Sequence, residues 1–176
     1  SLDLEIIEQT MINKRIVDRP WVDFVGLVGD PIAHPKFIEI IDIIYKHKPN
    51  AHINIHTNGG LKSPQFFEEL ATKLKNNQTL LQFSVDGLED TNHIYRIRAD
   101  WKSIMMGMKT MGSLPKDRKP WLEWKYLVFP YNKHQVPEAR KLAEEIGIDS
   151  YKPVKSERDI DNYHVPNNEI YDWSKQ

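Results

Sequence analysis

The 176-residue chain contains no cysteine, and this absence excludes several kinds of chemistry. Without thiols the chain forms no disulfide, and it offers no thiolate to zinc, no cysteine nucleophile and no cysteine ligand to an iron–sulfur cluster. Neither sign of charge dominates, because 24 Lys and Arg residues oppose 25 Asp and Glu residues. This balance argues against nucleic acid and against an anionic membrane surface as partners.

Long apolar runs are also missing from the sequence. No segment approaches the roughly 20 residues of a membrane span, and the opening residues SLDLE do not resemble a signal peptide. Hydrophobic residues make up 40% of the chain and charged residues 28%, which is the balance of a globular protein. These observations predict a soluble, cytoplasmic protein with one core and no membrane contact.

What the sequence does contain is an alternation of helix-like and strand-like apolar patterns. We expect helices near residues 4–11, 35–48, 64–74, 100–111 and 136–146, and strands near residues 22–28, 52–56, 80–85, 122–129 and 151–154. This alternation is typical of βαβ units and predicts an α/β fold built on a parallel sheet. The run at 22–28 is almost continuously apolar, so we expect that strand to be buried on both faces.

Small polar residues follow four of the expected strands, at the edge where parallel α/β folds bind ligands. They are GDP at 29–31, TNGG at 57–60, SVDG at 84–87 and FPYN at 129–132. Each group alone is compatible with a simple turn, since Asn-Gly and Asp-Gly are common turn dipeptides. Together, at one edge of a sheet, they favour a ligand site. Farther along, Arg96 either binds a ligand carboxylate or lies solvated in a loop.

A metal site is an alternative interpretation of the same edge. His56 ends an expected strand, and together with Asp30 and Asp86 it would provide the ligands of a metal-dependent hydrolase. The competing interpretation is that His56 packs or forms a hydrogen bond beside a turn.

The strand-end motifs, in this order, resemble those of radical S-adenosylmethionine (radical SAM) enzymes. Residues 29–31 resemble that family's Gly-Gly-Glu-Pro motif, and residues 57–59 resemble its Thr-Asn-Gly. The block FSVDGLEDTNHIYR at 83–96 resembles its Phe-Ser-Ile-Asp-Gly block with the arginine that follows, and is the most specific part. Val128 and Asn132 fit its Val-x-x-x-Asn pattern.

The resemblance covers roughly residues 21–154 and implies a fold and a reaction. The family folds as a partial (βα)6 TIM-like barrel, so residues 1–154 would be such a barrel core without its first strand. Residues 155–176 would be a polar tail or a lead into an absent segment. The family reductively cleaves S-adenosylmethionine (AdoMet) at a [4Fe-4S] cluster, giving a 5′-deoxyadenosyl radical that abstracts hydrogen from a substrate. No residue here selects a peptide, protein or metabolite as that substrate.

The resemblance also implies which residues would form the AdoMet site. Gly29 and Asp30 would lie at its amino group, Ser84, Asp86 and Arg96 at its carboxylate and ribose, Val128 and Asn132 beside its adenine, and Thr57 and Asn58 at the pocket floor.

Two departures from the family pattern shape the functional hypotheses. Asp30 stands where the family more often has glutamate, and the Cys-x-x-x-Cys-x-x-Cys cluster loop is absent. The simplest account is that the chain is a piece of a longer enzyme, beginning just after that loop and not competent alone. A cluster-free module that binds AdoMet or another nucleotide, or acts as a scaffold, is the second hypothesis. A missing first strand also predicts self-association at the exposed sheet edge.

Overall fold

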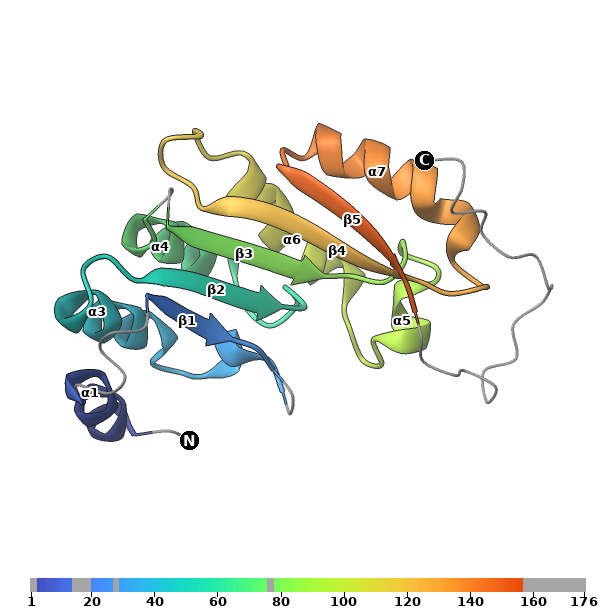
Figure 1. Cartoon of the computed structure of the whole chain (residues 1–176). Coiled ribbons are helices and arrows are strands. Elements are labelled where there is room, and N and C mark those ends of the chain that lie inside the picture. The colour runs from blue at the N-terminus through green and yellow to red at the C-terminus, as the bar shows by residue number, and fades with distance from the viewer. Residues whose placement is uncertain (1–2, 14–19, 27–28, 76–77, 157–176) are drawn as a thin grey trace.

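The computed structural model describes residues 3–13, 20–26, 29–75 and 78–156 (Figure 1). Its sheet consists of β1 (Trp21–Phe24), β2 (His52–Thr57), β3 (Thr79–Ser84), β4 (Trp121–Val128) and β5 (Ser150–Lys155). The strands lie in chain order, and every adjacent pair is parallel. This confirms the predicted parallel α/β fold. The sheet does not close into a barrel in the described part of the chain, so self-association at its edges stays a prediction.

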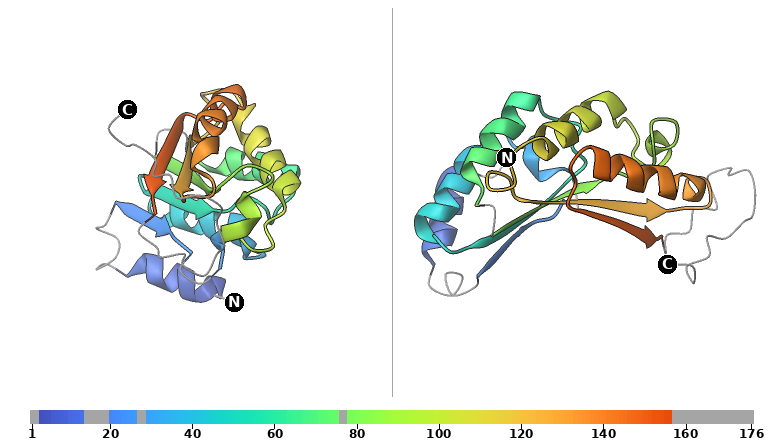
Figure 2. Two further views of the ribbon diagram at one scale, coloured as in Figure 1. Left: turned by 90° about the vertical axis from the view of Figure 1, so that its right-hand side faces the viewer. Right: turned by 90° about the horizontal axis from the view of Figure 1, so that it is seen from above.

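Helices connect the strands. They are α1 (Leu4–Ile12), η1 (Pro31–Ala33), α3 (Phe37–His47), α4 (Pro64–Lys73), α5 (Asn92–Tyr95), α6 (Trp101–Gly112), η2 (Lys133–Gln135) and α7 (Val136–Glu145). The long helices α3, α4, α6 and α7 lie together on one face of the sheet (Figure 2), which leaves the opposite face open toward the viewer in Figure 1. Within the described residues, no helix has the length and hydrophobicity needed to cross a membrane.

Side-chain caps explain where two of these helices begin. The Ser63 hydroxyl accepts a hydrogen bond from the backbone N of Phe66 at 3.4 Å, and proline occupies the first turn, where its missing N–H costs nothing. The Asp100 carboxylate accepts from the backbone N of Ser103 at 3.1 Å and caps α6. Both helices therefore begin where the sequence predicts, α4 after Ser63 and α6 after Asp100.

The core lies between the sheet and its helices. Ile53 and Ile55 are fully buried against the helices, whereas His52, Asn54 and His56 point to the open face, because successive side chains alternate across a strand. The other fully buried core residues include Leu81, Phe83, Leu122, Trp124, Ile41, Ile44, Phe67, Leu70, Ile104, Met108 and Met111. Polar strand residues are therefore left for the open face.

The strand β1 departs from the sequence expectation. The apolar run at 22–28 predicts burial on both faces, and this prediction is wrong, because β1 is an edge strand whose residues are exposed or half-buried. Trp21 is 57% exposed, and its ring lies 4.5 Å from that of His52 on the open face. Residues 27–28 of the predicted strand, like residues 157–176 of the predicted tail, lie outside the described residues.

Candidate functional site

The loops after β1 and β2 are joined by the side chain of Asp30. Its Oδ2 accepts hydrogen bonds from Thr57 Oγ1 at 2.8 Å and from the backbone N of Asn58 at 2.7 Å. Its Oδ1 accepts from the backbone N of Ile32 at 3.2 Å and caps η1. Gly29, at φ +102°, provides the left-handed conformation that leads into this cap. Asp30, Thr57 and Asn58 therefore form one hydrogen-bonded cluster.

The turn after β2 is held by the side chains of the same Thr-Asn pair. Thr57 Oγ1 accepts a hydrogen bond from the backbone N of Gly59 at 3.0 Å, and Asn58 Oδ1 accepts from that of Gly60 at 3.1 Å. Gly59 has φ +77°, and a Cβ at this position would lie 2.9 Å from a ring carbon of Phe83. The Thr-Asn-Gly sequence thus has a structural reason, and it fixes the backbone at the edge where ligands bind in such folds.

Asp86 joins the loop after β3 to β4. Its side chain is fully buried, with Oδ2 accepting from Arg96 Nε at 2.6 Å and Oδ1 from the backbone N of Leu127 at 2.7 Å. Its own backbone N donates to Asn92 Oδ1 at 2.9 Å. Burial raises the pKa of Asp86, while the Arg96 guanidinium and the Leu127 N–H act in the opposite direction. Both carboxylate oxygens are therefore engaged by groups of this chain.

Asn132 belongs to the same cluster as Asp86 and Arg96, and its side chain is also fully buried. Its Nδ2 donates to the backbone oxygens of Asp86 at 2.8 Å and Leu127 at 2.9 Å. Its Oδ1 accepts from the backbone N of Phe129 at 2.7 Å, and its backbone oxygen accepts from the Tyr126 hydroxyl at 3.0 Å. The whole amide is used to hold the ends of β3 and β4 together.

Two residues that no sequence pattern singled out, Asn92 and Gln135, fix the loop after β3. Gln135 Oε1 accepts from the backbone N of Leu88 at 3.1 Å and from the Thr91 hydroxyl, and Gln135 Nε2 donates to Asp90 Oδ1 at 2.6 Å. Asn92 is 1% exposed, and its Nδ2 has no hydrogen-bond partner among the described residues. Asn92 lies inside the most specific motif block, which was a usable signal. No sequence signal pointed to Gln135, because its hydrogen-bond partners lie 44 to 47 residues away in the sequence.

Two predicted residues keep polar groups available at this edge. Ser84 is half-buried, and its Oγ accepts from Gln82 Nε2 at 3.2 Å. The Arg96 side chain is 29% exposed and lies over the Tyr95 ring at 5.2 Å from its centre. Only its Nε is hydrogen-bonded within the described residues. Val128, by contrast, is 5% exposed and belongs to the core.

The predicted residues thus form two clusters at one edge of the sheet, where all the strand arrows of Figure 1 end. One cluster contains Asp30, Thr57 and Asn58, and the other contains Asp86, Arg96 and Asn132. They are close neighbours in the fold, because β2 and β3 are adjacent and Thr57 is in register with Phe83. No hydrogen bond between the two clusters is present in the described part of the chain.

These residues do not form a metal centre. Across residues 3–13, 20–26, 29–75 and 78–156, no three His, Cys, Asp or Glu side chains gather as a ligand set. Two of the proposed ligands have other partners: the Asp30 carboxylate accepts a hydrogen bond from Thr57, and the Asp86 carboxylate accepts one from Arg96. The prediction of a hydrolytic metal site from Asp30, His56 and Asp86 is therefore wrong.

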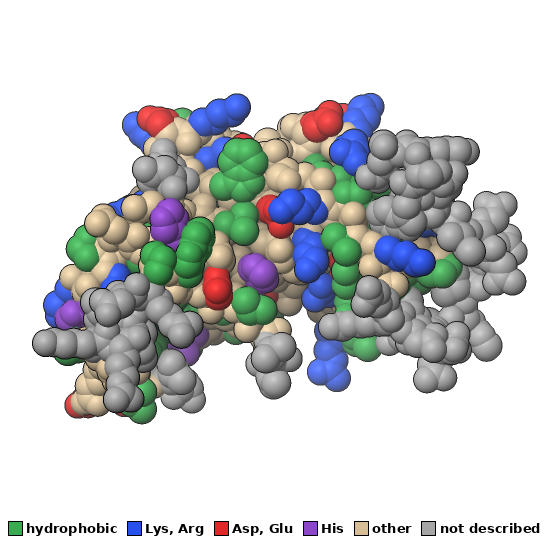
Figure 3. Space-filling model, viewed as in Figure 1, with side chains coloured by type: hydrophobic (Ala, Val, Ile, Leu, Met, Phe, Trp, Pro, Cys, Tyr) green, Lys and Arg blue, Asp and Glu red, His purple; other side chains and the backbone are tan. Residues whose placement is uncertain are grey.

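Charged side chains lie on the open face, away from the helices (Figure 3). Asp23 Oδ1 accepts from Asn54 Nδ2 at 2.6 Å on the first two strands. Lys152 Nζ lies 2.5 Å from Glu123 Oε2 on the last two. Lys125 lies on the same face as this second pair, because it is next to Lys152 in register. The face that a closed barrel would turn inward therefore carries charged side chains as well as the exposed Trp21.

We predict that His56 makes the stability of the chain sensitive to mildly acidic pH. Burial lowers the pKa of His56 below its usual value, and the Lys125 ammonium acts in the same direction. The unfolded chain binds this proton at a higher pH than the folded chain. The free energy of unfolding should therefore fall as the pH drops below about 6.5, until the folded pKa is passed.

Urea unfolding at several pH values between 5 and 8 measures this effect. The variant His56→Gln should lose less stability than the wild type over that range. His93→Gln, at an exposed position, should behave as the wild type does. Identical pH profiles for His56→Gln and the wild type would contradict the assignment.

Comparison with known proteins identifies the family of the chain and solved structures with a similar fold. The model of the radical SAM superfamily matches residues 1–143. A search of curated proteins finds no match. Among solved structures, hexahistidine-tagged anSMEcpe with bound AdoMet is similar, with a TM-score of 0.64 and 16% sequence identity. Native anSMEcpe with bound AdoMet and the Cp18Cys peptide gives a TM-score of 0.63 and 17% identity.

Both likenesses cover 88% of this chain but only 43% of the solved chains. The chain therefore spans less than half the length of the structures it resembles. At these identities the likeness establishes a shared fold.

Proposed function

The chain belongs to the radical SAM superfamily, and we propose that it is the AdoMet-binding core of an enzyme that cleaves this cofactor reductively. The observation that carries the proposal is the pair of hydrogen-bonded clusters at the carboxyl edge of the sheet, built from the family's strand-end motifs. Bound beside a reduced cluster in this family, AdoMet supplies the group that abstracts hydrogen from a substrate.

The side chains at this edge fit the amino-acid part of AdoMet. An ammonium group needs acceptors, and the backbone at Gly29 and Oδ1 of Asp30, which among the described residues accepts only one hydrogen bond, from Ile32 N, supply them. A carboxylate and ribose hydroxyls need donors, which Ser84 and the free end of the Arg96 guanidinium supply. Asn92 Nδ2, buried without a partner among the described residues, is a further donor in the segment after β3.

The remaining predicted residues take other parts in this proposal. Thr57 and Asn58 shape the floor beneath the cofactor, and Val128 and the backbone around Asn132 lie beside its adenine. Asp86 acts through Arg96, because it holds the Nε of that guanidinium and leaves the outer nitrogens for a ligand.

A [4Fe-4S] cluster does not fit the residues of this chain. Cluster irons are held by cysteine thiolates, and the sequence has none. We propose that these ligands come from outside the 176 residues, and that the chain alone binds AdoMet without cleaving it. The second candidate is a cluster-free module that binds AdoMet or another nucleotide, which the absence of cysteine favours. Iron–sulfur reconstitution of the protein encoded by the complete gene, followed by its visible absorption, separates the two candidates.

Calorimetric titration with AdoMet tests the binding function that both candidates share. The wild-type chain should bind AdoMet, and Arg96→Lys should weaken binding about tenfold, because lysine keeps the charge beside Asp86 but lacks the forked donor set. Arg118→Lys makes the same change at an exposed position just before β4. This position lies at the amino-terminal ends of the strands, away from the proposed site, so the affinity for AdoMet should be unchanged. Melting curves confirm that both variants fold. Absence of AdoMet binding by the wild type would reject the proposal.

A further inference from the structure

The chain contains one Asn-Gly junction, Asn58–Gly59, and it lies in the turn after β2. In such a junction the glycine nitrogen can attack the asparagine carboxamide, because glycine has no side chain to shield that nitrogen. Asn58 is half-buried and Gly59 is buried, so the junction lies partly inside the protein. Its reactivity therefore depends on how the fold holds the two reacting groups.

The Thr57 hydroxyl engages the nitrogen that would react. Its Oγ1 donates to Asp30 Oδ2 at 2.8 Å and accepts from the Gly59 N–H at 3.0 Å. Thr57 is 2% exposed, so water does not compete for these hydrogen bonds. The carboxamide is held as well, because Asn58 Oδ1 accepts from the backbone N of Gly60 at 3.1 Å. Both the nucleophile and the electrophile are therefore bound to other groups.

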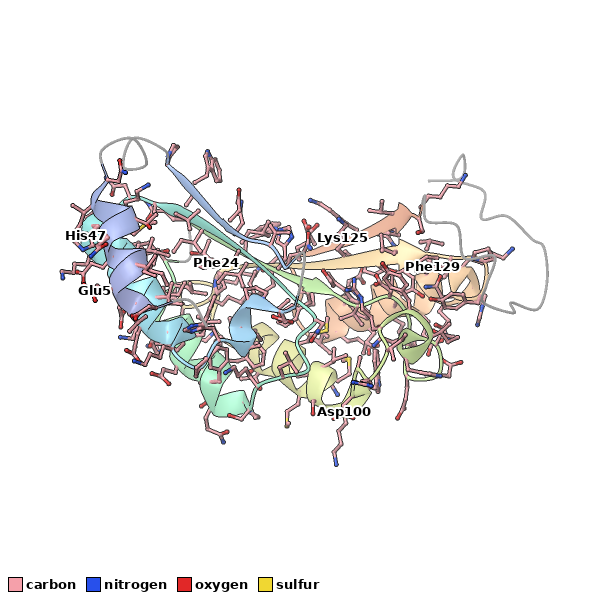
Figure 4. All side chains as sticks on the ribbon, turned by 90° about the horizontal axis from the view of Figure 1, so that it is seen from below. Glu5, Phe24, His47, Asp100, Lys125 and Phe129 are labelled. Atoms are coloured by element: carbon pink, nitrogen blue, oxygen red, sulfur yellow. The ribbon has the colours of Figure 1, made fainter. Side chains whose placement is uncertain are left out.

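Packing against α6 keeps the turn in this conformation. Gly59 has φ +77°, and a Cβ at this position would lie 2.9 Å from a ring carbon of Phe83. A Cβ on Gly60 would lie 3.8 Å from the backbone oxygen of Asp100, which Figure 4 labels on the helix side of the sheet. The Gly59 nitrogen reaches the carboxamide only when this turn opens, so the reaction rate follows the open fraction.

We propose that the Asn58–Gly59 junction is a deamidation site that the Thr57 hydroxyl holds unreactive. When the turn opens, the Gly59 nitrogen forms a bond to the side-chain carbonyl carbon of Asn58. The C–N bond of the carboxamide breaks, and its nitrogen leaves as ammonia with the proton that Gly59 loses. Water then opens the succinimide ring and leaves aspartate or isoaspartate at position 58.

Both products change the cluster around Asp30. Aspartate adds a second carboxylate beside Asp30, whose Oδ2 already accepts from the backbone N of Asn58 at 2.7 Å. Isoaspartate also inserts a methylene into the backbone between Thr57 and Gly59, which breaks the hydrogen bond that closes the turn. Modification should therefore disturb the floor of the AdoMet site. This consequence rests on the proposed function, whereas the reaction itself does not.

Peptide mapping by mass spectrometry, after ageing at mildly alkaline pH, measures the rate at Asn58. Native Thr57→Val should react about tenfold faster than native wild type, because it loses the hydroxyl bonded to Asp30 and Gly59. Thr57→Ser keeps the hydroxyl and should react as slowly as the wild type. The control Thr72→Val removes an exposed hydroxyl on α4 and should also match the wild type. In guanidinium chloride all four chains should react alike and faster than the native wild type.

Amide hydrogen exchange tests the same hydrogen bond without a variant. Low concentrations of guanidinium chloride should raise exchange of the Gly59 N–H and deamidation of Asn58 by the same factor, since both need the turn to open. Equal deamidation rates for the native and the unfolded wild type would overturn the proposal. So would equal rates for native Thr57→Val and wild type, or deamidation that does not follow exchange.

Calorimetric titration with AdoMet tests the consequence of the modification. Ion-exchange chromatography separates the aged chain from the fresh chain by its additional negative charge. The fresh wild type should bind AdoMet, and the chain modified at position 58 should bind it more weakly. Equal affinities would reject the effect on the AdoMet site. Failure of the fresh wild type to bind would reject the proposed function, while the deamidation rates would still decide the modification site.

Discussion

Asp86→Asn should lower the free energy of unfolding by about 3 kcal/mol, because it breaks a buried charge pair and leaves one donor unmatched. The carboxylate accepts from Arg96 Nε on one oxygen and from the Leu127 N–H on the other. An amide accepts on its oxygen alone, so its NH2 group must face one of those two donors. Urea unfolding at pH 7 measures the loss.

A matched control separates this effect from the loss of one negative charge. Glu68→Gln makes the corresponding change on the exposed face of α4 and should stay within about 0.5 kcal/mol of the wild type. Combining Asp86→Asn with Arg96→Leu should cost less than the sum of the two single variants, since the double variant leaves neither charge unpaired. Additive losses would mean that the two side chains are not coupled.

The secondary structure of this chain could be predicted from the sequence because it depends on local patterns. Apolar residues recur at helical spacing in α3 and α4, and the strands β2 to β5 fall where apolar runs or period-two patterns predict them. In a parallel sheet the carboxyl ends of all strands lie on the same side. Motifs that directly follow the strands could therefore be predicted to lie near one another in the fold.

The partners of the site residues could not be predicted, because they are distant in the sequence. Asp86 binds the backbone of a residue 41 positions later, and Asn132 binds the backbone of a residue 46 positions earlier. Sequence suggested both as ligand-binding residues, whereas the structure directs their side chains to the protein itself. Their direct contact with a cofactor stays a prediction, and a positioning role accounts for the contacts they make.

The periodicity of apolar residues also could not predict whether a strand lies at the edge or in the centre of the sheet. An apolar run predicts a strand buried on both faces, but Trp21 and Phe24 belong to an edge strand beside the open face. Lys125 shows the converse. It lies within a mostly apolar run, and only the register with Ser84 and Lys152 reveals that it faces the open side.

Asn132→Asp should be among the most damaging single changes, costing about 4 kcal/mol at pH 7. The Nδ2 group donates to two backbone oxygens, those of Asp86 and Leu127, in a fully buried site. An ionised carboxylate would place negative charge against both of them without a compensating donor. Asn50→Asp is the control: Asn50 is exposed before β2, so the introduced carboxylate stays solvated.

The loss caused by Asn132→Asp should also depend on pH, in a direction that identifies its cause. Protonation of the introduced carboxyl restores one donor, and burial favours the protonated form in the folded chain. Relative to the wild type, the destabilisation should therefore grow as the pH rises above about 4, the usual pKa of aspartate. Urea unfolding of both variants between pH 4 and 8 measures this difference. Equal losses for Asn50→Asp and Asn132→Asp, or a loss independent of pH, would show that the buried amide does not hold the ends of β3 and β4 together.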